Sequence, residues 1–205
     1  MERGPGGEVL NPTRLVVLLS GSGSTLQNLL DRCADGRLAA TVAGVVSSRP
    51  DVFGVERARR AGVPVAVVEK TGRSESAFAA ARSWSADLVV CAGWIHLLKV
   101  PQDFRGQVLN VHPSLLPKFG GKGMYGRHVH EAVLAAGETE SGCTVHFVDD
   151  TYDTGPVVLH ARVPVLPGDT PDTLAERVQA AEREALPAGI AQFQVPSSRF
   201  QVDGV

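Results

Sequence analysis

Asn110 and His112 stand at the end of an apolar run, two residues apart, and Pro113 follows them directly. Residues two apart in a β-strand project from the same face, so this spacing places an amide beside an imidazole. Both side chains can donate hydrogen bonds to an oxygen on which negative charge develops. The pair therefore predicts a catalytic site at the end of this strand. The simpler alternative is a histidine that is satisfied inside the core.

Three acids follow in a loop further along the chain. The stretch HFVDDTYDTGP, residues 146–156, holds Asp149, Asp150 and Asp153. Any of them could reach an imidazole and stabilise its charged form. Acids are ordinary turn residues, and that interpretation is strong for Asp149 and Asp150. It is weaker for Asp153, which directly precedes Thr-Gly-Pro.

A break rich in glycine and serine, SGSGST at residues 20–25, separates an apolar run from a segment with helical spacing. Backbone N–H groups at the start of a helix attract anions, and the hydroxyls of Ser22, Ser24 and Thr25 would lie beside them. The break therefore predicts an anion site suited to one phosphate. A tight turn that needs glycine, with a serine capping the helix, is an equal alternative.

Two larger phosphate-binding motifs do not fit this break. A dinucleotide fingerprint would have a third glycine where the chain has Leu26, and an acid where it has Ser47, Ser48 and Arg49. A nucleoside triphosphate loop would contain Gly-Lys-Ser/Thr, and the break has no lysine. These absences disfavour a nicotinamide-dependent dehydrogenase.

The scaffold that positions these residues is visible in the alternation of short β-rich runs with segments of helical spacing, from Arg14 to about Leu109. The series begins with RLVVLL, TLQNLLDRCA and TVAGVVSS. It predicts right-handed βαβ units, and so a single-domain α/β fold with a doubly wound, mostly parallel sheet flanked by helices. Ligands of such sheets bind at the carboxyl ends of the strands.

The pattern changes after residue 112. The glycine-rich stretch PSLLPKFGGKGMYG precedes a helix predicted at about 127–137. CTVHFVDD and PVVLHARVPV are typical of an antiparallel strand pair. The last segment, TPDTLAERVQAAEREALPAGIAQF, predicts a long helix that Thr170 or Asp172 could cap.

Composition narrows the class of protein. The 205 residues are 43% hydrophobic, which suits one domain, expected at 13–195 between loose tails at 1–12 and 196–205. A formal charge of −2 with scattered Lys and Arg disfavours nucleic acid as a partner. The chain has no signal-peptide core, no membrane-spanning apolar run and no CxxC pair, so we expect a cytoplasmic protein with reduced thiols. A homodimer is compatible with the sequence, which does not determine the oligomeric state.

The combination of NVHPSLLP at 110–117, VHFVDDTYDTGP at 145–156 and SGSGSTLQNLL at 20–30 closely resembles the glycinamide ribonucleotide formyltransferases, folate-dependent enzymes of purine synthesis. The resemblance runs from about Leu15 to Gln192, and Asn-x-His-Pro-Ser-Leu-Leu-Pro is specific to the formyl-transfer superfamily. It implies transfer of a formyl group from the co-substrate 10-formyltetrahydrofolate to the amine of glycinamide ribonucleotide, without a metal.

The resemblance also implies roles for individual residues. Asn110, His112 and Asp153 match the family's catalytic positions. The residues that match the ribonucleotide site are Gly21, Ser22, Gly23, Ser24, Thr25 and Glu182. Those that match the walls of the folate pocket are Trp94, Ile95, His96, Leu97, Leu98, Val148, Asp149 and Asp150. The chain departs from the family in having Thr25 where asparagine is frequent, His96 where arginine is frequent, and a long loop at 118–128.

Other activities have weaker support. Methionyl-tRNA formyltransferase and formyltetrahydrofolate deformylase, from the same superfamily, carry additional domains for which this chain has no room. A catalytically silent ligand-binding module would share the fold, because the presence of catalytic residues does not prove turnover. A metal site is disfavoured, since no cysteine or third histidine stands at a zinc-like spacing from His128 and His130.

Overall fold

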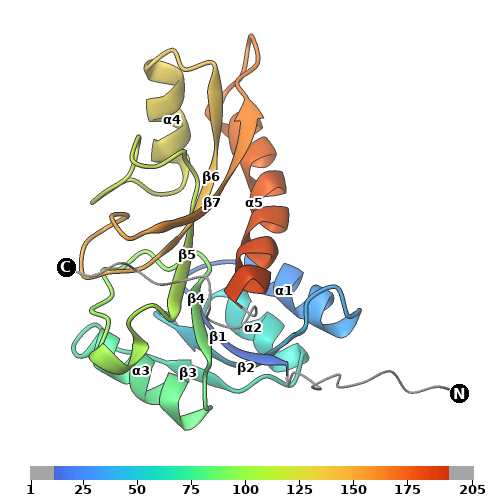
Figure 1. Ribbon diagram of the computed structural model, residues 1–205, viewed down its shortest axis with the longest axis vertical. Helices are drawn as coiled ribbons and strands as arrows, with labels where there is room; N and C mark the ends of the chain where they lie inside the picture. The colour runs from blue at the N-terminus through green and yellow to red at the C-terminus, as the bar shows by residue number, and fades with distance from the viewer. Residues whose placement is uncertain (1–11, 194–205) are drawn as a thin grey trace, which may run out of the picture.

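A seven-stranded sheet forms the centre of the molecule (Figure 1). The computed structural model describes residues 12–193, so the expected tails lie outside the described residues except for Pro12. The strand order is β3-β2-β1-β4-β5-β6-β7. Strands β1 to β5 are parallel, β6 is antiparallel to β5, and β7 is antiparallel to β6. The strands are β1 Thr13–Leu19, β2 Ala40–Ser47, β3 Val65–Val67, β4 Leu88–Cys91, β5 Val108–His112, β6 Glu140–Phe147 and β7 Val157–Pro164. The predicted fold class is confirmed.

Helices cover both faces of this sheet. Alternate residues of β1 point to opposite sides, so Val17 packs with α1 and α5 while Val16 packs with α3. The buried strands are apolar on both faces, which is typical of a parallel sheet covered by helices. The helices are α1 Ser24–Ala34, α2 Phe53–Arg60, α3 Arg73–Ser83, α4 Arg127–Ala135 and α5 Pro171–Phe193, with a short 3₁₀ helix at Gln102–Phe104.

The strand order reverses direction between β1 and β4. In doubly wound sheets, ligands bind in the crevice outside the carboxyl ends of the strands at such a point. The chain leaves β1 through residues 20–23, leaves β4 through residues 92–98, and leaves β5 at His112. Three of the stretches singled out in the sequence therefore emerge at the same edge.

The last third of the chain completes the site from the other side. β6 pairs antiparallel with β5 so that His146 lies opposite Asn110 and Thr144 opposite His112. Thr170 caps α5, since its hydroxyl accepts a hydrogen bond from the backbone N–H of Thr173 at 3.2 Å. The capping role predicted for Thr170 or Asp172 thus falls to Thr170, and α5 packs along β6 and β7.

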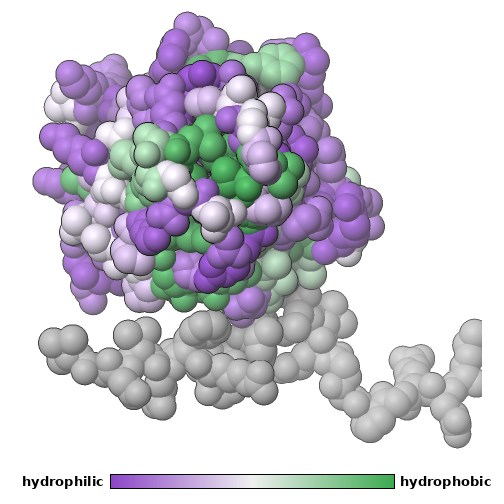
Figure 2. Space-filling model, turned by 90° about the horizontal axis from the view of Figure 1, so that it is seen from above, coloured by the Kyte–Doolittle hydropathy of each residue, from purple (hydrophilic) through white to green (hydrophobic). Residues whose placement is uncertain are grey.

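The surface seen from above in Figure 2 is mainly hydrophilic at its rim, and hydrophobic residues gather near its centre. Within residues 12–193, no helix combines the length and the apolar character needed to cross a membrane.

Candidate active site

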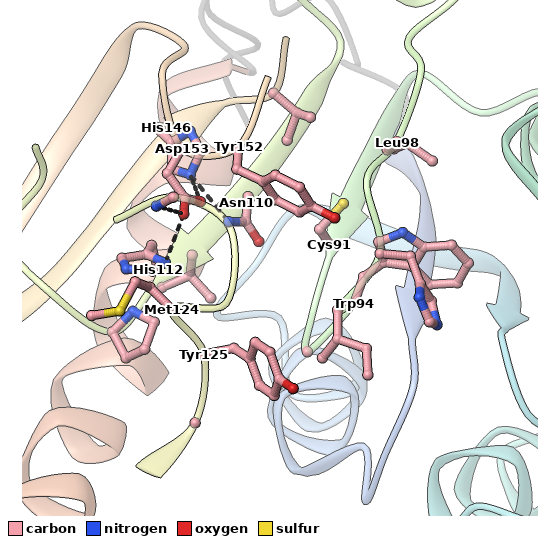
Figure 3. A pocket seen from close by; sticks show the side chains of 18 of the residues that line it. Cys91, Trp94, Leu98, Asn110, His112, Met124, Tyr125, His146, Tyr152 and Asp153 are labelled. Atoms are coloured by element: carbon pink, nitrogen blue, oxygen red, sulfur yellow. Dashed lines mark hydrogen bonds and ion pairs between the residues drawn. The ribbon is translucent and has the colours of Figure 1, made fainter. Parts of the chain in front are cut away.

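A pocket of about 560 Å³ lies at the carboxyl edge of β4 and β5. In Figure 3 a polar group made of Asn110, His112, His146 and Asp153 faces an apolar wall made of Cys91, Trp94 and Leu98. The predicted site residues that line it are Thr25, Trp94, Ile95, His96, Leu97, Leu98, Asn110, His112, Val148, Asp149, Asp153 and Glu182. The fold thus brings residues from five separate stretches of the sequence to one cavity.

His112 has a protein partner at each ring nitrogen. Its Nε2 lies 2.8 Å from the carbonyl oxygen of Phe119, and its Nδ1 lies 3.5 Å from Asp153 Oδ2. The side chain is 5% exposed and that of Asp153 is 10% exposed, so water screens this pair only weakly. This arrangement suits an imidazolium, because both ring nitrogens face oxygen acceptors.

Asp153 is the centre of the polar group. Its backbone adopts φ 58°, a left-handed conformation that aspartate and asparagine tolerate better than most residues. Oδ2 accepts a hydrogen bond from the Gly121 N–H at 2.9 Å, and Oδ1 lies 3.6 Å from His146 Nε2. The carboxylate therefore joins the glycine-rich loop to both histidines.

Asn110 presents its amide to the pocket beside His112. Its Nδ2 lies 3.0 Å from His146 Nε2, the residue opposite it across the β5–β6 ladder. An amide nitrogen carries two hydrogens, so this contact leaves a second N–H for a ligand. The predicted pairing of an amide with an imidazole on one strand face is present.

The apolar wall opposite this group comes from β4 and the segment that follows it. Trp94 contacts His96 edge-on, with ring centroids 5.5 Å apart. Burial and the nearby charge of Arg73 lower the pKa of His96, which keeps this ring neutral near neutral pH. Burial raises the pKa of Cys91 to about 12, so this pocket thiol stays protonated and is no nucleophile.

The loop at 21–25 lies at the start of α1, and only Thr25 belongs to the pocket lining. Gly23 is the N-cap residue with φ 69°, and a Cβ there would lie 2.6 Å from the Cα of Gly54. The turn therefore requires glycine, as in the alternative interpretation of this break as a tight turn. The serine cap of that alternative is absent, since the N-cap residue is Gly23 and has no side-chain capping hydrogen bond. The N–H groups of the first turn of α1 are accordingly available to an anion.

The three acids of the 146–156 stretch have separate positions. Asp149 lines the pocket and accepts hydrogen bonds from the Thr154 hydroxyl. Asp150 lies outside the lining, where it forms an ion pair with Arg105 at 2.9 Å and accepts a hydrogen bond from the Val100 N–H. Of the three, Asp153 alone contacts His112.

Glu182 reaches the pocket from α5, one helical turn beyond Gln179, which also lines it. Removal from water raises the pKa of Glu182 to about 7, and the charge of Arg183 partly offsets this rise. Such a carboxyl exchanges a proton near neutral pH and can accept a hydrogen bond from a ligand hydroxyl or amine.

Sequence reasoning missed several lining residues. Gln179 was detectable, because residues three apart share a helix face and Glu182 was already a candidate. His146 lies within the predicted strand CTVHFVDD, and its position in the pocket depends on the β5–β6 register. His130 and the loop residues Lys122, Met124 and Tyr125 also line the pocket, although none of them was a named candidate.

Within the described residues, no three His, Cys, Asp or Glu side chains are grouped so that they could hold a metal ion. Cys33, Cys91 and Cys143 are all free thiols.

Comparison with known proteins identifies this architecture. Residues 13–190 match the family described as formyl transferase. Phosphoribosylglycinamide formyltransferase of Escherichia coli is 39% identical over 187 residues, which cover 87% of this chain and 86% of that protein. The chain belongs to the formyl transferase family. The resemblance inferred from the sequence motifs is thereby confirmed.

Other relatives of this formyl transferase agree. Glycinamide ribonucleotide transformylase 1 from Symbiobacterium toebii has the same fold, with a TM-score of 0.84, 38% identity and 93% of both chains covered. The trifunctional purine biosynthetic protein adenosine-3 of Drosophila melanogaster is 42% identical over 190 residues. The formyl transferase spans 88% of its own length in that match but only 14% of the length of the fly protein.

Proposed function

We propose that the protein transfers the formyl group of 10-formyltetrahydrofolate to the primary amine of glycinamide ribonucleotide, in de novo purine biosynthesis. The products are formylglycinamide ribonucleotide and tetrahydrofolate. The observation that carries this proposal is the meeting of Asn110, His112 and Asp153 at one wall of a pocket whose other wall is apolar. A folate ring system suits such an apolar wall, and the polar wall suits the reacting formyl group.

The chemistry follows from this arrangement. The substrate amine attacks the formyl carbon, the carbonyl bond opens, and negative charge gathers on the formyl oxygen. The free N–H of Asn110 is placed to stabilise that oxygen before the charge develops. The intermediate then collapses, the bond from carbon to N10 breaks, and one proton passes from the attacking nitrogen to N10.

His112 would assist at the same oxygen or in this proton transfer. Its Nε2 donates to the Phe119 carbonyl, so a ligand oxygen would have to replace or share that acceptor. Asp153, 3.5 Å from Nδ1, stabilises the imidazolium form.

The two substrates would occupy opposite ends of the pocket. The N-terminus of α1 would hold the ribonucleotide phosphate, with Thr25 facing the cavity and Glu182 nearby on α5. Trp94 to Leu98, Val148 and Asp149 would enclose the folate. Asp150 would support this wall indirectly, through its contacts with Arg105 and Val100.

An absorbance assay with 10-formyl-dideazafolate, with and without glycinamide ribonucleotide, tests the proposal. Release of deformylated folate only in the presence of the ribonucleotide is the expected result. Release without it would indicate a hydrolase. No release under either condition would point to another acceptor or to a silent binding module.

Replacing Glu182 with glutamine should weaken ribonucleotide binding and stabilise the fold. Loss of the carboxylate should raise the KM for the ribonucleotide about tenfold, because a hydrogen bond to a charged group is lost. The folded-state pKa of about 7 exceeds the reference value of 4.5, so the wild type loses stability as pH rises between these values. The free energy of unfolding of the variant should therefore exceed that of the wild type by about 1–3 kcal/mol at about pH 8. At about pH 4 the two proteins should be equally stable.

Urea unfolding at both pH values, together with steady-state kinetics, checks this prediction. Glu184→Gln is a suitable control, because Glu184 lies on the exposed side of α5 and pairs with Arg32. An equal stability gain at both pH values would contradict the linkage argument.

Replacing Gly23 with alanine should damage the phosphate loop. The new Cβ would clash with the backbone of Gly54 and the residue would keep an unfavourable φ, so we expect about 2 kcal/mol less stability and a raised KM for the ribonucleotide. Gly21→Ala is the matched comparison for stability, since a Cβ there has open space. A Gly23→Ala protein that lost affinity for the folate alone would count against the phosphate assignment.

The proposal includes action in the cytoplasm on small-molecule substrates, by a domain that spans residues 13–195. Analytical ultracentrifugation of the full chain determines whether it forms the homodimer that the sequence allows.

A further inference from the structure

His146 is a fully buried histidine, 2% exposed, whose two ring nitrogens have different partners. Nδ1 lies 2.8 Å from the carbonyl oxygen of Phe147, and Nε2 lies 3.0 Å from Asn110 Nδ2. A carbonyl oxygen can only accept, so Nδ1 must carry a hydrogen. An amide nitrogen can only donate, so Nε2 must be unprotonated. The contacts therefore define one neutral tautomer of His146.

The neutral ring also defines the orientation of Asn110, because the Phe147 carbonyl holds the hydrogen on Nδ1 and leaves a lone pair on Nε2. With Nε2 of His146 as acceptor, the amide must turn its nitrogen toward β6, and its second N–H remains for the pocket. Reversal of the amide would place Asn110 Oδ1 against the lone pair of His146 Nε2 and turn the N–H groups away from His146. The register that sets His146 opposite Asn110 is what fixes this choice.

We propose that His146 is a positioning residue, which as the neutral Nδ1–H tautomer accepts one N–H of Asn110 and so holds the other N–H of that amide toward the formyl oxygen. This inference rests on the proposed function. His146 itself has no role in proton transfer here, because its Nε2 is occupied by Asn110 and its Nδ1 by the backbone.

Protonation of His146 would reverse this arrangement. Nε2–H would then face the Asn110 N–H, donor against donor, and the acceptor within reach is Asp153 Oδ1 at 3.6 Å. The charged groups that act on His146 are Asp153 and Asp149 in the loop after β6, which favour protonation, and His112 on β5, which opposes it. Burial outweighs them and lowers the pKa of His146, so the neutral form prevails near neutral pH.

A matched pair of variants tests the proposal. His146→Asn keeps a donor near the Nδ1 position and removes the acceptor, whereas His146→Gln keeps an acceptor oxygen near the Nε2 position and cannot titrate. We expect kcat to fall about tenfold or more in His146→Asn and to stay within about threefold in His146→Gln, with both KM values little changed. Relative to about pH 7.5, His146→Gln should retain more of its kcat at about pH 5.5 than the wild type.

Nitrogen-15 NMR of histidine-labelled wild-type protein supplies a measurement that does not depend on a variant folding. The expected spectrum shows His146 with Nδ1 protonated and Nε2 unprotonated at neutral pH. The opposite tautomer, or equal kcat in both variants and the wild type, would overturn the inference. Absence of formyl transfer in the wild type would instead overturn the proposed function. The NMR spectrum would still report the tautomer of His146, because that measurement does not depend on activity.

Discussion

Replacing Asp153 with asparagine should lower kcat by about a thousandfold while leaving the fold intact. Asparagine has the same shape, tolerates the φ of 58° and can still accept a hydrogen bond from the Gly121 N–H. What it lacks is the negative charge 3.5 Å from His112 Nδ1 and 3.6 Å from His146 Nε2. The loss would therefore report on stabilisation of charge at His112, not on loop structure.

Single-turnover kinetics, combined with thermal unfolding, checks this prediction. Asp103→Asn is the matched control, since it removes the same charge from an exposed ion pair with Arg82 outside the pocket lining. Because Asp153 and His112 act as one unit, adding His112→Ala to Asp153→Asn should cost little more than either change alone. If the losses in kcat of the two single variants multiplied in the double variant, or if the Asp153→Asn protein were nearly as active as the wild type, the assignment of Asp153 as the partner of His112 would be wrong.

Replacing Gly155 with alanine should be among the most destabilising single changes, at about 3 kcal/mol. A Cβ at this buried glycine would lie 1.9 Å from the carbonyl oxygen of Phe147, so the backbone must move. That carbonyl accepts the hydrogen bond from His146 Nδ1, and the backbone N–H of Phe147 donates to Pro156. The same displacement should therefore disturb both the loop that carries Asp153 and the tautomer of His146.

Urea unfolding of Gly155→Ala beside Gly168→Ala separates this clash from ordinary glycine effects. Gly168 has φ 82° but open space around its Cβ position, so its replacement should cost only about 1 kcal/mol. Similar losses in the two variants would show that the contact with Phe147 relaxes at little cost.

Hydrophobic periodicity was enough to predict the fold. The apolar runs that became β1, β2 and β4 are buried on both faces, and such runs are distinctive when helical segments separate them. The period-2 spacing of Asn110 and His112 likewise predicted a shared strand face, and both side chains contact the same group of His146 and Asp153. The boundaries were less exact: α4 ends at Ala135, two residues before the predicted end, where Gly137 adopts a positive φ.

The contacts between elements could not be predicted from the sequence. Asp149, Asp150 and Asp153 carry the same carboxyl group, so residue type alone does not distinguish them. The path of the loop places Asp153 beside His112 and Asp150 beside Arg105. The carbonyl of Phe119 on His112 Nε2 and the N–H of Gly121 on Asp153 also come from a loop whose shape its glycines leave open.

The sequence by itself determined the strand and helix pattern, the catalytic candidates and the family, because these depend on residue types at short, fixed spacings. The tertiary structure alone decided that His146 stands opposite Asn110, since a shift of one residue in the β5–β6 register would turn that ring to the other face of the sheet. It also raised the pKa of Glu182 to about 7, because a carboxyl's pKa depends on the water and charges around it, which only the packed chain defines.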